Sequence, residues 1–375
     1  MTPLLTHVTT RRTPRLAVWI VGLFFGGLLW LSLSELNPDW LAYRLIFESD
    51  GAWLGESGRD PVFLGLNTLM IAVLGDGGYE TFRLLVAVYF FAFSLAFVTG
   101  RLSAPAISRA GPLSLSLAFI YLGFARFTIQ IREGLAITVV MFAIALFQKA
   151  ERRTHALGIE QGFQCLPWLL MLLATGIHAS IGFVFLVMLT GRWVAGFGLD
   201  VAIPVQAQRR KVLWLIATIV AIAITVQLKF GGALDDIASE TLGDRLIEQK
   251  DVTAAQFLFW GIYGVVCWVV YREARAGITS ASRQTPIEAF LLVLAGPATF
   301  AIYASIIAAL SFGITGLVIS SYARLLYMFL ALSIVYLASG GRRNWRVTLC
   351  CAFLLIDQMR NIADSISIYF GVDLY

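Results

Sequence analysis

Long apolar runs recur along the chain from Leu16 towards the C-terminus, and they limit the possible folds more than any other feature. Most of them hold about 15 to 24 residues, close to the ~20 that a helix needs to cross a hydrocarbon layer of ~30 Å. Of the 375 residues, 59% are hydrophobic and 14% are charged, against roughly 25% charged in a soluble domain. The sequence therefore predicts an all-α integral membrane protein, with residues 1–375 forming one polytopic helical domain.

The charges of the connecting segments predict the topology, because segments rich in Lys and Arg stay in the cytoplasm. The basic segments, expected inside, are 1–15, 101–111, 149–165, 191–211, 272–286 and 341–346. The outer loops 34–61 and 230–253 each hold more acids than bases. The expected crossings are 16–33, 83–100, 112–127, 133–148, 212–229, 254–271, 287–310, 322–340 and 347–360. This order places the N-terminus in the cytoplasm and the C-terminus outside.

Two apolar stretches do not fit simple crossings. Val62 to Gly75 spans only ~21 Å as a helix, so we expect it to dip into the membrane and return. Leu166 to Thr190 lies between two basic segments and is interrupted by Gly176, His178 and Ser180, as in a re-entrant hairpin; a single span with one exceptional loop is the alternative. Non-helical backbone survives at membrane depth only inside protein or beside a wet cavity. We thus expect about 9–11 membrane segments, two of them re-entrant, and a cavity that opens outward.

Ionisable side chains within the apolar segments are few, and a charge at the bilayer centre costs ~2.5–3.5 kcal/mol on insertion scales. The turn between the third and fourth crossings places Arg126, Arg132 and Glu133 at the outer boundary, with the amide of Gln130. Such a turn suits the binding of an anion. The structural alternative is an interfacial Arg–Glu pair that merely ends two helices.

Three further groups carry charge in apolar surroundings. Arg324 stands at the outer start of a crossing, where a snorkelling arginine is the alternative to a functional one. His178 is the only histidine well inside an apolar stretch, and a hydrogen-bonded packing residue is its alternative. Asp357, Arg360 and Asp364 share one helical face and predict a structural salt bridge.

The predicted topology gathers Arg126, Arg132 and Arg324 on the outer face. Guanidinium groups bind phosphate oxygens in pairs, so these arginines suit a phosphate or pyrophosphate head group whose apolar tail stays in the bilayer. The first outer loop adds Trp40 and Trp53, which can stack on sugar faces. It also supplies polar side chains suited to sugar hydroxyls or proton transfer: Asp39, Tyr43, Arg59 and Asp60.

Short motifs follow one another in a fixed order along most of the chain: Asp39-Trp40 and Tyr43, Asp60-Pro61-Val62-Phe63 with Asn67, Gln130-Ile131-Arg132-Glu133-Gly134-Leu135-Ala136, His178-Ala179-Ser180, and Arg324 near the start of a late crossing. In this order the chain resembles the EpsG-type exopolysaccharide polymerases, whose role is similar to that of the Wzy-type O-antigen polymerases. It departs from the family pattern at Asp60, usually glutamate, at Val62, usually glycine, and at Glu133, usually glutamine.

The resemblance implies a fold similar to that of the helical membrane glycosyltransferases. It also implies the polymerisation of oligosaccharide repeat units linked to undecaprenyl pyrophosphate, at the outer face of the bacterial inner membrane. A chain-length co-polymerase is the protein partner that it implies. The rival functions are a flippase or transporter of the lipid-linked oligosaccharide, an integral-membrane acyltransferase that modifies a polysaccharide, and a structural subunit of an export complex.

The expected roles of the residues follow from this reaction. The arginines hold the pyrophosphate: Arg126, Arg132 and Arg324. His178 is the first choice as general base, with Asp60 or Asp39 as the alternative and Glu133 as a further catalytic carboxylate. The sugar contacts are expected from Tyr43, Arg59, Gln130 and Tyr327.

Several classes of ligand leave no trace in the sequence. There is no glycine-rich phosphate loop and no Asp-x-Asp metal motif, so we expect neither a nucleotide, a metal nor another cofactor. Basic residues lie between apolar runs rather than in a stripe with interleaved aromatics, so nucleic acid is not an expected partner.

Overall fold

The computed structural model describes residues 40–49, 60–75, 78–98, 130–157, 165–196, 248–278, 290, 293–339, 345–354 and 356–357. The chain falls into two compact units. Unit 1 comprises Met1–Ser49, Leu69–Ile131 and Ala338–Tyr375, and unit 2 comprises Asp50–Thr68 and Arg132–Leu337. The expected crossings 16–33, 112–127 and 212–229 lie outside the described residues.

In unit 1 a short helix of the first outer loop packs on a membrane helix. Helix α2 (Trp40–Glu48) buries Tyr43 and Phe47 on one face, and the Phe47 ring lies 5.7 Å from that of Tyr79 and 5.6 Å from that of Phe82. Both partners begin α5 (Tyr79–Val98), which matches the crossing expected over 83–100. The outer loop thus contains a packed helix.

The short apolar stretch after Asp60 forms α4 (Pro61–Leu74), a helix of 14 residues that fits the expected length. Pro61 opens it at the position where the missing N–H costs nothing. Gly75 ends it with a φ of 75°, a conformation that glycine adopts readily, and its N–H bonds to the carbonyl of Ile71. That α4 dips into the membrane and returns stays a prediction.

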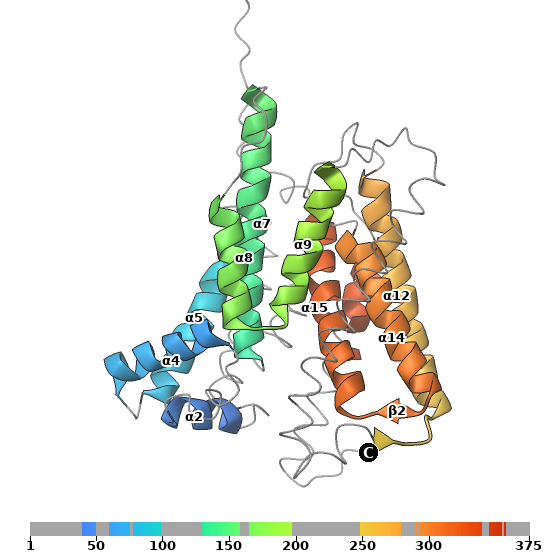
Figure 1. The fold of residues 1–375 in the computed structure, drawn as a ribbon, viewed down its shortest axis with the longest axis horizontal. Coiled ribbons are helices and arrows are strands. Elements are labelled where there is room, and N and C mark those ends of the chain that lie inside the picture. Colours follow the sequence, from blue (N-terminus) through green and yellow to red (C-terminus); the bar gives the residue numbers. More distant parts are fainter. Residues whose placement is uncertain are drawn as a thin grey trace, which may run out of the picture. The chain divides into compact units, whose positions relative to one another are not determined.

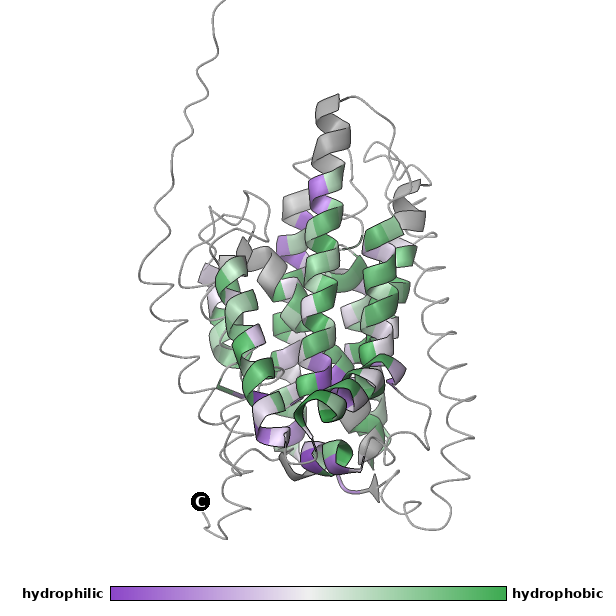
Figure 2. Ribbon diagram, turned by 90° about the vertical axis from the view of Figure 1, so that its left-hand side faces the viewer, coloured by the Kyte–Doolittle hydropathy of each residue, from purple (hydrophilic) through white to green (hydrophobic). Residues whose placement is uncertain are grey.

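In unit 2, α7 (Ile131–Leu157) starts inside the predicted polar turn. The apolar span of this helix, Ile131–Ala150, matches the crossing expected over 133–148, and the helix itself continues to Leu157. Residues 149–153 read Lys-Ala-Glu-Arg-Arg, all good helix formers, so the helix can extend past the apolar layer into water. Figure 2 shows the hydropathy change along the helices, with hydrophilic residues concentrated towards their ends.

The apolar stretch 166–190 is broken at the predicted residues. Helix α8 (Cys165–Ile177) ends before His178, and α9 (Ile181–Gly196) runs back beside it (Figure 1). Trp168 packs edge-on against Phe147 of α7, with 5.1 Å between the ring centroids, and against Phe185 of α9, with 5.8 Å between the ring centroids. The chain therefore forms a helical hairpin rather than one straight span, while its re-entry into a membrane stays a prediction.

The rest of unit 2 holds three longer helices and a small sheet. Helix α12 (Ala254–Ile278) packs beside a π-helical turn, η3 (Leu294–Ala298), which leads directly into α14 (Thr299–Ser311). Helix α15 (Leu317–Ser339) follows. A side chain at Gly264 of α12 would lie 2.7 Å from Cζ of Tyr303 in α14, so the glycine permits this close packing. In unit 1, a further helix over residues 345–354 matches the crossing expected over 347–360.

Strands β1 (Glu248–Gln249) and β2 (Ile314–Thr315) pair antiparallel near the ends of α12 and α15 (Figure 1). Glu248 lies opposite Thr315, and Gln249 lies opposite Ile314. The predicted order of crossings places both segments outside, so the pairing agrees with the predicted topology.

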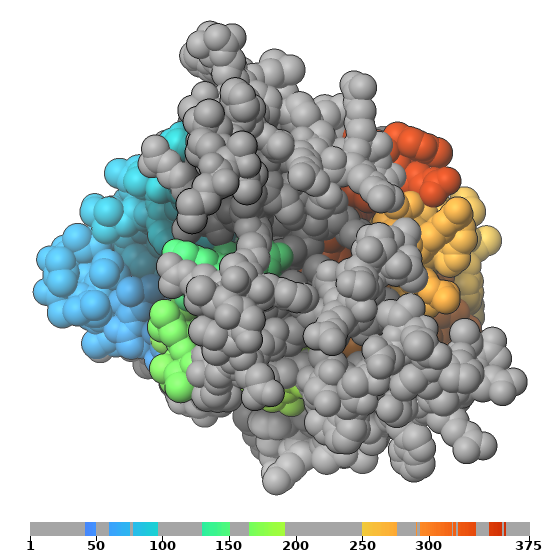
Figure 3. All heavy atoms as spheres, turned by 90° about the horizontal axis from the view of Figure 1, so that it is seen from above, coloured from blue at the N-terminus to red at the C-terminus, as the bar shows by residue number. Residues whose placement is uncertain are grey.

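Among the described residues, four helices are long and apolar enough to cross a membrane: Tyr79–Ala96, Ile131–Ala150, Ala254–Arg275 and Leu294–Ser311. Large apolar side chains of α12, including Leu258 and Val265, are exposed. The atoms of this segment, yellow-orange in Figure 3, lie at the right-hand edge of that view. Such a surface is stable against lipid rather than water, and the protein is an all-α membrane protein.

The strand pairing predicts a cross-link. With the native cysteines replaced by alanine, Glu248→Cys and Thr315→Cys should form a disulfide on mild oxidation, because facing residues of paired strands have Cβ atoms ~4.5–5.5 Å apart. A gel-shift assay would measure it. The control pair, Glu248→Cys with Lys149→Cys in the basic extension of α7, should not cross-link; equal cross-linking of both pairs would contradict the pairing.

Candidate functional site

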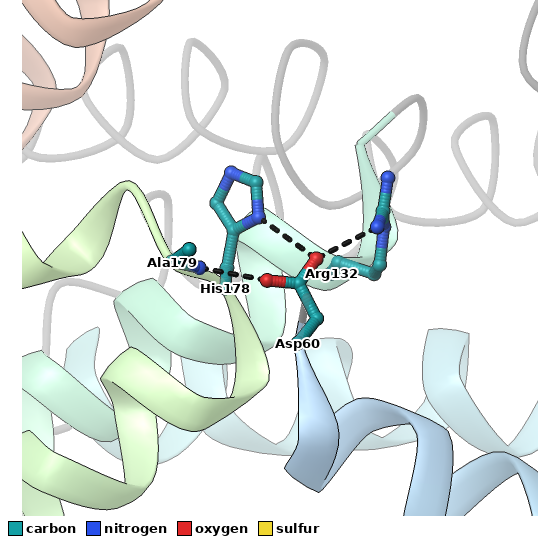
Figure 4. A network of polar contacts seen from close by, with 4 residues as sticks. All are labelled: Asp60, Arg132, His178 and Ala179. Carbon is teal, nitrogen blue, oxygen red and sulfur yellow. Dashed lines mark hydrogen bonds and ion pairs between the residues drawn. The ribbon is translucent and has the colours of Figure 1, made fainter. Parts of the chain in front are cut away.

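The carboxylate of Asp60 joins three segments of unit 2 that are far apart in the sequence (Figure 4). Nη1 of Arg132 donates to Oδ2 at 2.7 Å, and the backbone N–H of Ala179 donates to Oδ1 at 2.8 Å. Nδ1 of His178 lies 3.5 Å from Oδ2. Asp60 is only 4% exposed. The first residues of α4 and α7 and the tip of the α8–α9 hairpin therefore meet at one buried anion.

The backbone of Asp60 is strained. Its φ of 55° lies in the left-handed region, which non-glycine residues seldom adopt, and the following Pro61 favours an extended conformation instead. Such strain costs about 1–3 kcal/mol and persists only where the surroundings hold it. Here the two hydrogen bonds to the carboxylate, from Arg132 and the Ala179 N–H, hold it, and strain of this kind is common at functional sites.

Local structure explains how each group reaches the site. The carbonyl of Asp60 accepts the first helical hydrogen bond of α4, from Leu64 N–H at 3.0 Å, so Asp60 is the N-cap of that helix. The Ala179 amide lies just before α9, where backbone N–H groups have no partner within the helix. Asp60 accepts this hydrogen bond too, and its negative charge suits the positive end of the α9 dipole.

Close packing of Val62 against Gly176 brings α4 to the hairpin. A Cβ built on Gly176 would lie 2.5 Å from Cγ2 of Val62, so no larger residue fits there without movement. Val62 is one of the departures from the motif pattern noted in the sequence. Its side chain occupies the space that Gly176 leaves open.

Asp60 is ionised at neutral pH. Burial alone would raise the pKa of its carboxyl, but the nearby His178, the Ala179 N–H and Arg132 together lower the pKa below the ordinary 3.8. The Arg132 guanidinium also lies over the Phe63 ring, 5.9 Å from its centroid. Asp60 is thus a fixed anion, and a carboxylate of lowered pKa is a weak base.

His178 is the more accessible of the two groups, with a side chain 22% exposed against 4% for Asp60. Its Nδ1 is too far from Oδ2 for a strong hydrogen bond, so the carboxylate acts on the ring chiefly through its charge. The second ring nitrogen points away from Asp60 (Figure 4). That nitrogen is free of the carboxylate and can exchange a proton with a bound molecule.

The other predicted site residues lie in varied surroundings. Glu133 follows Arg132 on α7 and is buried, and Gln130 directly precedes α7. Arg324 is exposed on α15 in the same unit, and Tyr327, one turn further, contacts the ring of Tyr263 at 5.4 Å.

Four of the predicted site residues are not among those described in unit 2. Tyr43 is buried in unit 1, packed on the inner face of α2. The remaining three lie outside the described residues: Asp39, Arg59 and Arg126. Within the described ranges, no group of three or more His, Cys, Asp or Glu is placed to hold a metal.

One buried charge escaped the sequence reasoning. Arg83 of α5 is 1% exposed, although it was expected only as the first residue of a crossing. The signal was present, because Arg83 is the one charged residue between Thr81 and Gly100. Because Arg83 stands near the start of this apolar run, it resembles a boundary residue rather than a charge within the run.

The apolar helices and the buried charged cluster define a polytopic membrane protein with an enzyme-like polar site. The chain belongs to the EpsG family, whose model matches residues 16–372. The resemblance drawn from the short motifs is thereby confirmed. Membership indicates a role of the exopolysaccharide polymerase type and an enzyme of the glycosyltransferase kind. No curated protein and no solved structure matches the chain.

The contact between α4 and α8 predicts a compensating pair of substitutions. Gly176→Ala should destabilise the protein by about 1–3 kcal/mol, because the new methyl group overlaps Val62. Val62→Gly in the same chain should restore much of the loss, since it removes the overlapping atoms. Thermal unfolding in detergent would measure both variants. Gly65→Ala is the control, as a Cβ there meets nothing within 4 Å; a Gly176→Ala variant no less stable than this control would contradict the packing.

The lowered pKa of Asp60 predicts how stability depends on pH. A carboxyl whose folded pKa lies below its unfolded value contributes stability that is complete above the unfolded value and is lost as pH falls through the folded pKa. Asp60→Asn should therefore cost about 1.5–3 kcal/mol at neutral pH, and the cost should shrink only in acid, below roughly pH 4. Thermal midpoints of both proteins across pH would show this. A difference that disappears between pH 8 and 6 would mean that another group carries the effect.

Proposed function

We propose that the protein polymerises oligosaccharide repeat units linked to undecaprenyl pyrophosphate at the outer face of a bacterial inner membrane. The observation that carries this proposal is the meeting of Arg132, His178 and the Asp60 carboxylate at one site of unit 2. A cation able to hold a phosphate there lies beside a base able to accept a proton. Membership of the EpsG family supports the same chemistry.

The proposed reaction is the transfer of a glycan block between two lipid-linked substrates. A sugar hydroxyl of the acceptor attacks the anomeric carbon of the donor glycan, and a new glycosidic bond forms. The bond between that carbon and the pyrophosphate oxygen breaks, and undecaprenyl pyrophosphate leaves with the bonding electrons. The hydroxyl proton passes to the base.

We assign the base to His178 rather than to Asp60. Its outward ring nitrogen accepts the proton, while the buried anion Asp60 orients the ring and stabilises the imidazolium that forms. Asp60 itself is unsuited to the task, because it is buried and its pKa is lowered. This assignment chooses between the alternatives that the sequence left open.

The arginines act on the leaving group. Negative charge grows on the pyrophosphate as the bond breaks, and a guanidinium held in place beforehand stabilises that charge without reorganising. Asp60 and the Phe63 ring hold Arg132 in this way. Exposed Arg324 of the same unit supplies a second cation. A sugar contact from Tyr327, also in unit 2, completes the proposed site.

Purified protein supplied with lipid-linked repeat units alone would test the function. Polymer should lengthen without nucleotide sugars, and His178→Ala should slow lengthening about 10²- to 10⁴-fold, the usual contribution of a general base. His155→Ala, at the far end of α7, is the matched control and should behave as wild type. Gel electrophoresis of the glycan would follow chain length.

Other outcomes would point to the rival functions. Movement of the lipid-linked unit across a vesicle membrane without lengthening indicates a flippase, and its modification by an added acyl donor indicates an acyltransferase. Normal polymer from a protein carrying both Arg132→Ala and Arg324→Ala would exclude the proposed stabilisation of the leaving group.

A further inference from the structure

A buried cation lies in unit 1, in the candidate membrane span of α5. Arg83 is 1% exposed and ranks among the largest fully buried side chains. Its Nη1 donates to the Tyr79 hydroxyl at 3.2 Å, and its Cζ lies 5.7 Å from the centroid of the same ring. Its Nε and Nη2 are buried without an acceptor, and no carboxylate in the described part of the chain pairs with it. A buried positive charge in an apolar helix calls for an anion.

The two unsatisfied atoms define which anion fits. Nε and Nη2 share one edge of the planar guanidinium, and their N–H bonds point in the same direction. This edge donates two parallel hydrogen bonds to neighbouring oxygens of a phosphate or a carboxylate.

We propose that Arg83 forms a binding site for the phosphate group of a membrane lipid. Arg83 lies in the first turns of α5, and the opposite face of this helix exposes Leu84, Leu85 and Val88, an apolar surface suited to lipid. Lipid therefore borders α5 close to the buried guanidinium, and the phosphate of such a lipid is the anion at hand.

Helix α2 limits access to this site. Phe47 of α2 packs on the rings of Tyr79 and Phe82, the residues of α5 that lie one turn before Arg83 and directly before it. The predicted topology puts the start of α5 at the outer surface, level with lipid head groups. A phosphate therefore enters from the outer leaflet and needs no passage through the apolar layer.

A second phosphate site has a use in the proposed reaction. Block transfer joins two lipid-linked substrates, so two lipid phosphates have to be held. The assignment of Arg83 to one of these substrates rests on the proposed function. The binding of a lipid phosphate does not, and it is tested without any glycan.

The experiment measures the affinity of the full-length protein, in detergent, for a short-chain polyprenyl pyrophosphate, for phosphatidylglycerol and for inorganic pyrophosphate. Arg83→Met should weaken binding of at least one of the two lipids roughly tenfold, the loss expected for a charge-assisted pair of hydrogen bonds. Arg83→Lys should bind with intermediate affinity, because it keeps the charge but lacks the paired donors. The control is Arg44→Met, since Arg44 forms an exposed pair with Glu48, and it should bind as wild type.

Stability without ligand separates binding from a structural role. Arg83→Met removes a buried charge that has no anionic partner, so the lipid-free variant should unfold at the same temperature as wild type or higher. A lower unfolding temperature together with wild-type affinity in Arg83→Lys would overturn the proposal. Unchanged affinity of Arg83→Met for both lipids would also overturn it. If inorganic pyrophosphate bound as tightly as the lipids and with the same dependence on Arg83, the assignment to a lipid would be wrong.

Discussion

The described site depends on one buried carboxylate. Asp60 ends the first outer loop, caps α4, accepts a hydrogen bond from the hairpin tip and neutralises Arg132 of α7. Without this anion the Ala179 N–H and the Arg132 guanidinium would each lose a hydrogen-bond acceptor, and buried polar groups are stable only when paired. The strained backbone at Asp60 would also lose the contacts that hold it. The position of His178 follows from the same anchor, because its ring lies beside a carboxylate that is itself fixed from three sides.

Arg132, which is partly exposed, and Arg83, which is buried, illustrate opposite solutions to one problem. Arg132 has its counter-ion within the protein, so its charge is neutralised before any substrate arrives. Arg83 has only a tyrosine hydroxyl and an aromatic face among the described residues. An apolar setting strengthens every electrostatic interaction. Arg83, which has no carboxylate beside it among the described residues, therefore attracts an anion more strongly than Arg132, which is paired with Asp60.

Much of this arrangement was predictable from the sequence, since apolar runs, loop charges and ordered motifs depend on local composition. They gave the helical membrane class, the break at His178 and the start of α7. The ion pair of Asp60 with Arg132 was not predictable, because it joins residues 72 positions apart and loop charges define only a side of the membrane. Asp60 was accordingly treated as one acid among several. Arg83 was not predictable as a buried charge, because a charge at the edge of an apolar run resembles a boundary.

The π-helical turn before α14 has a consequence for how this chain tolerates length changes. A turn of this type holds one residue more than an α-helical turn, and Thr299 partly closes it through a hydrogen bond to the carbonyl of Leu294. Deleting one residue of Leu294–Ala298 would restore a regular helix but rotate the preceding segment by about 100° relative to α14. Gly296, which packs against Tyr271, and Tyr303, which fits against Gly264, could then no longer both face α12. The number of residues in this turn is therefore constrained by packing, just as the absence of a side chain at Gly296 is.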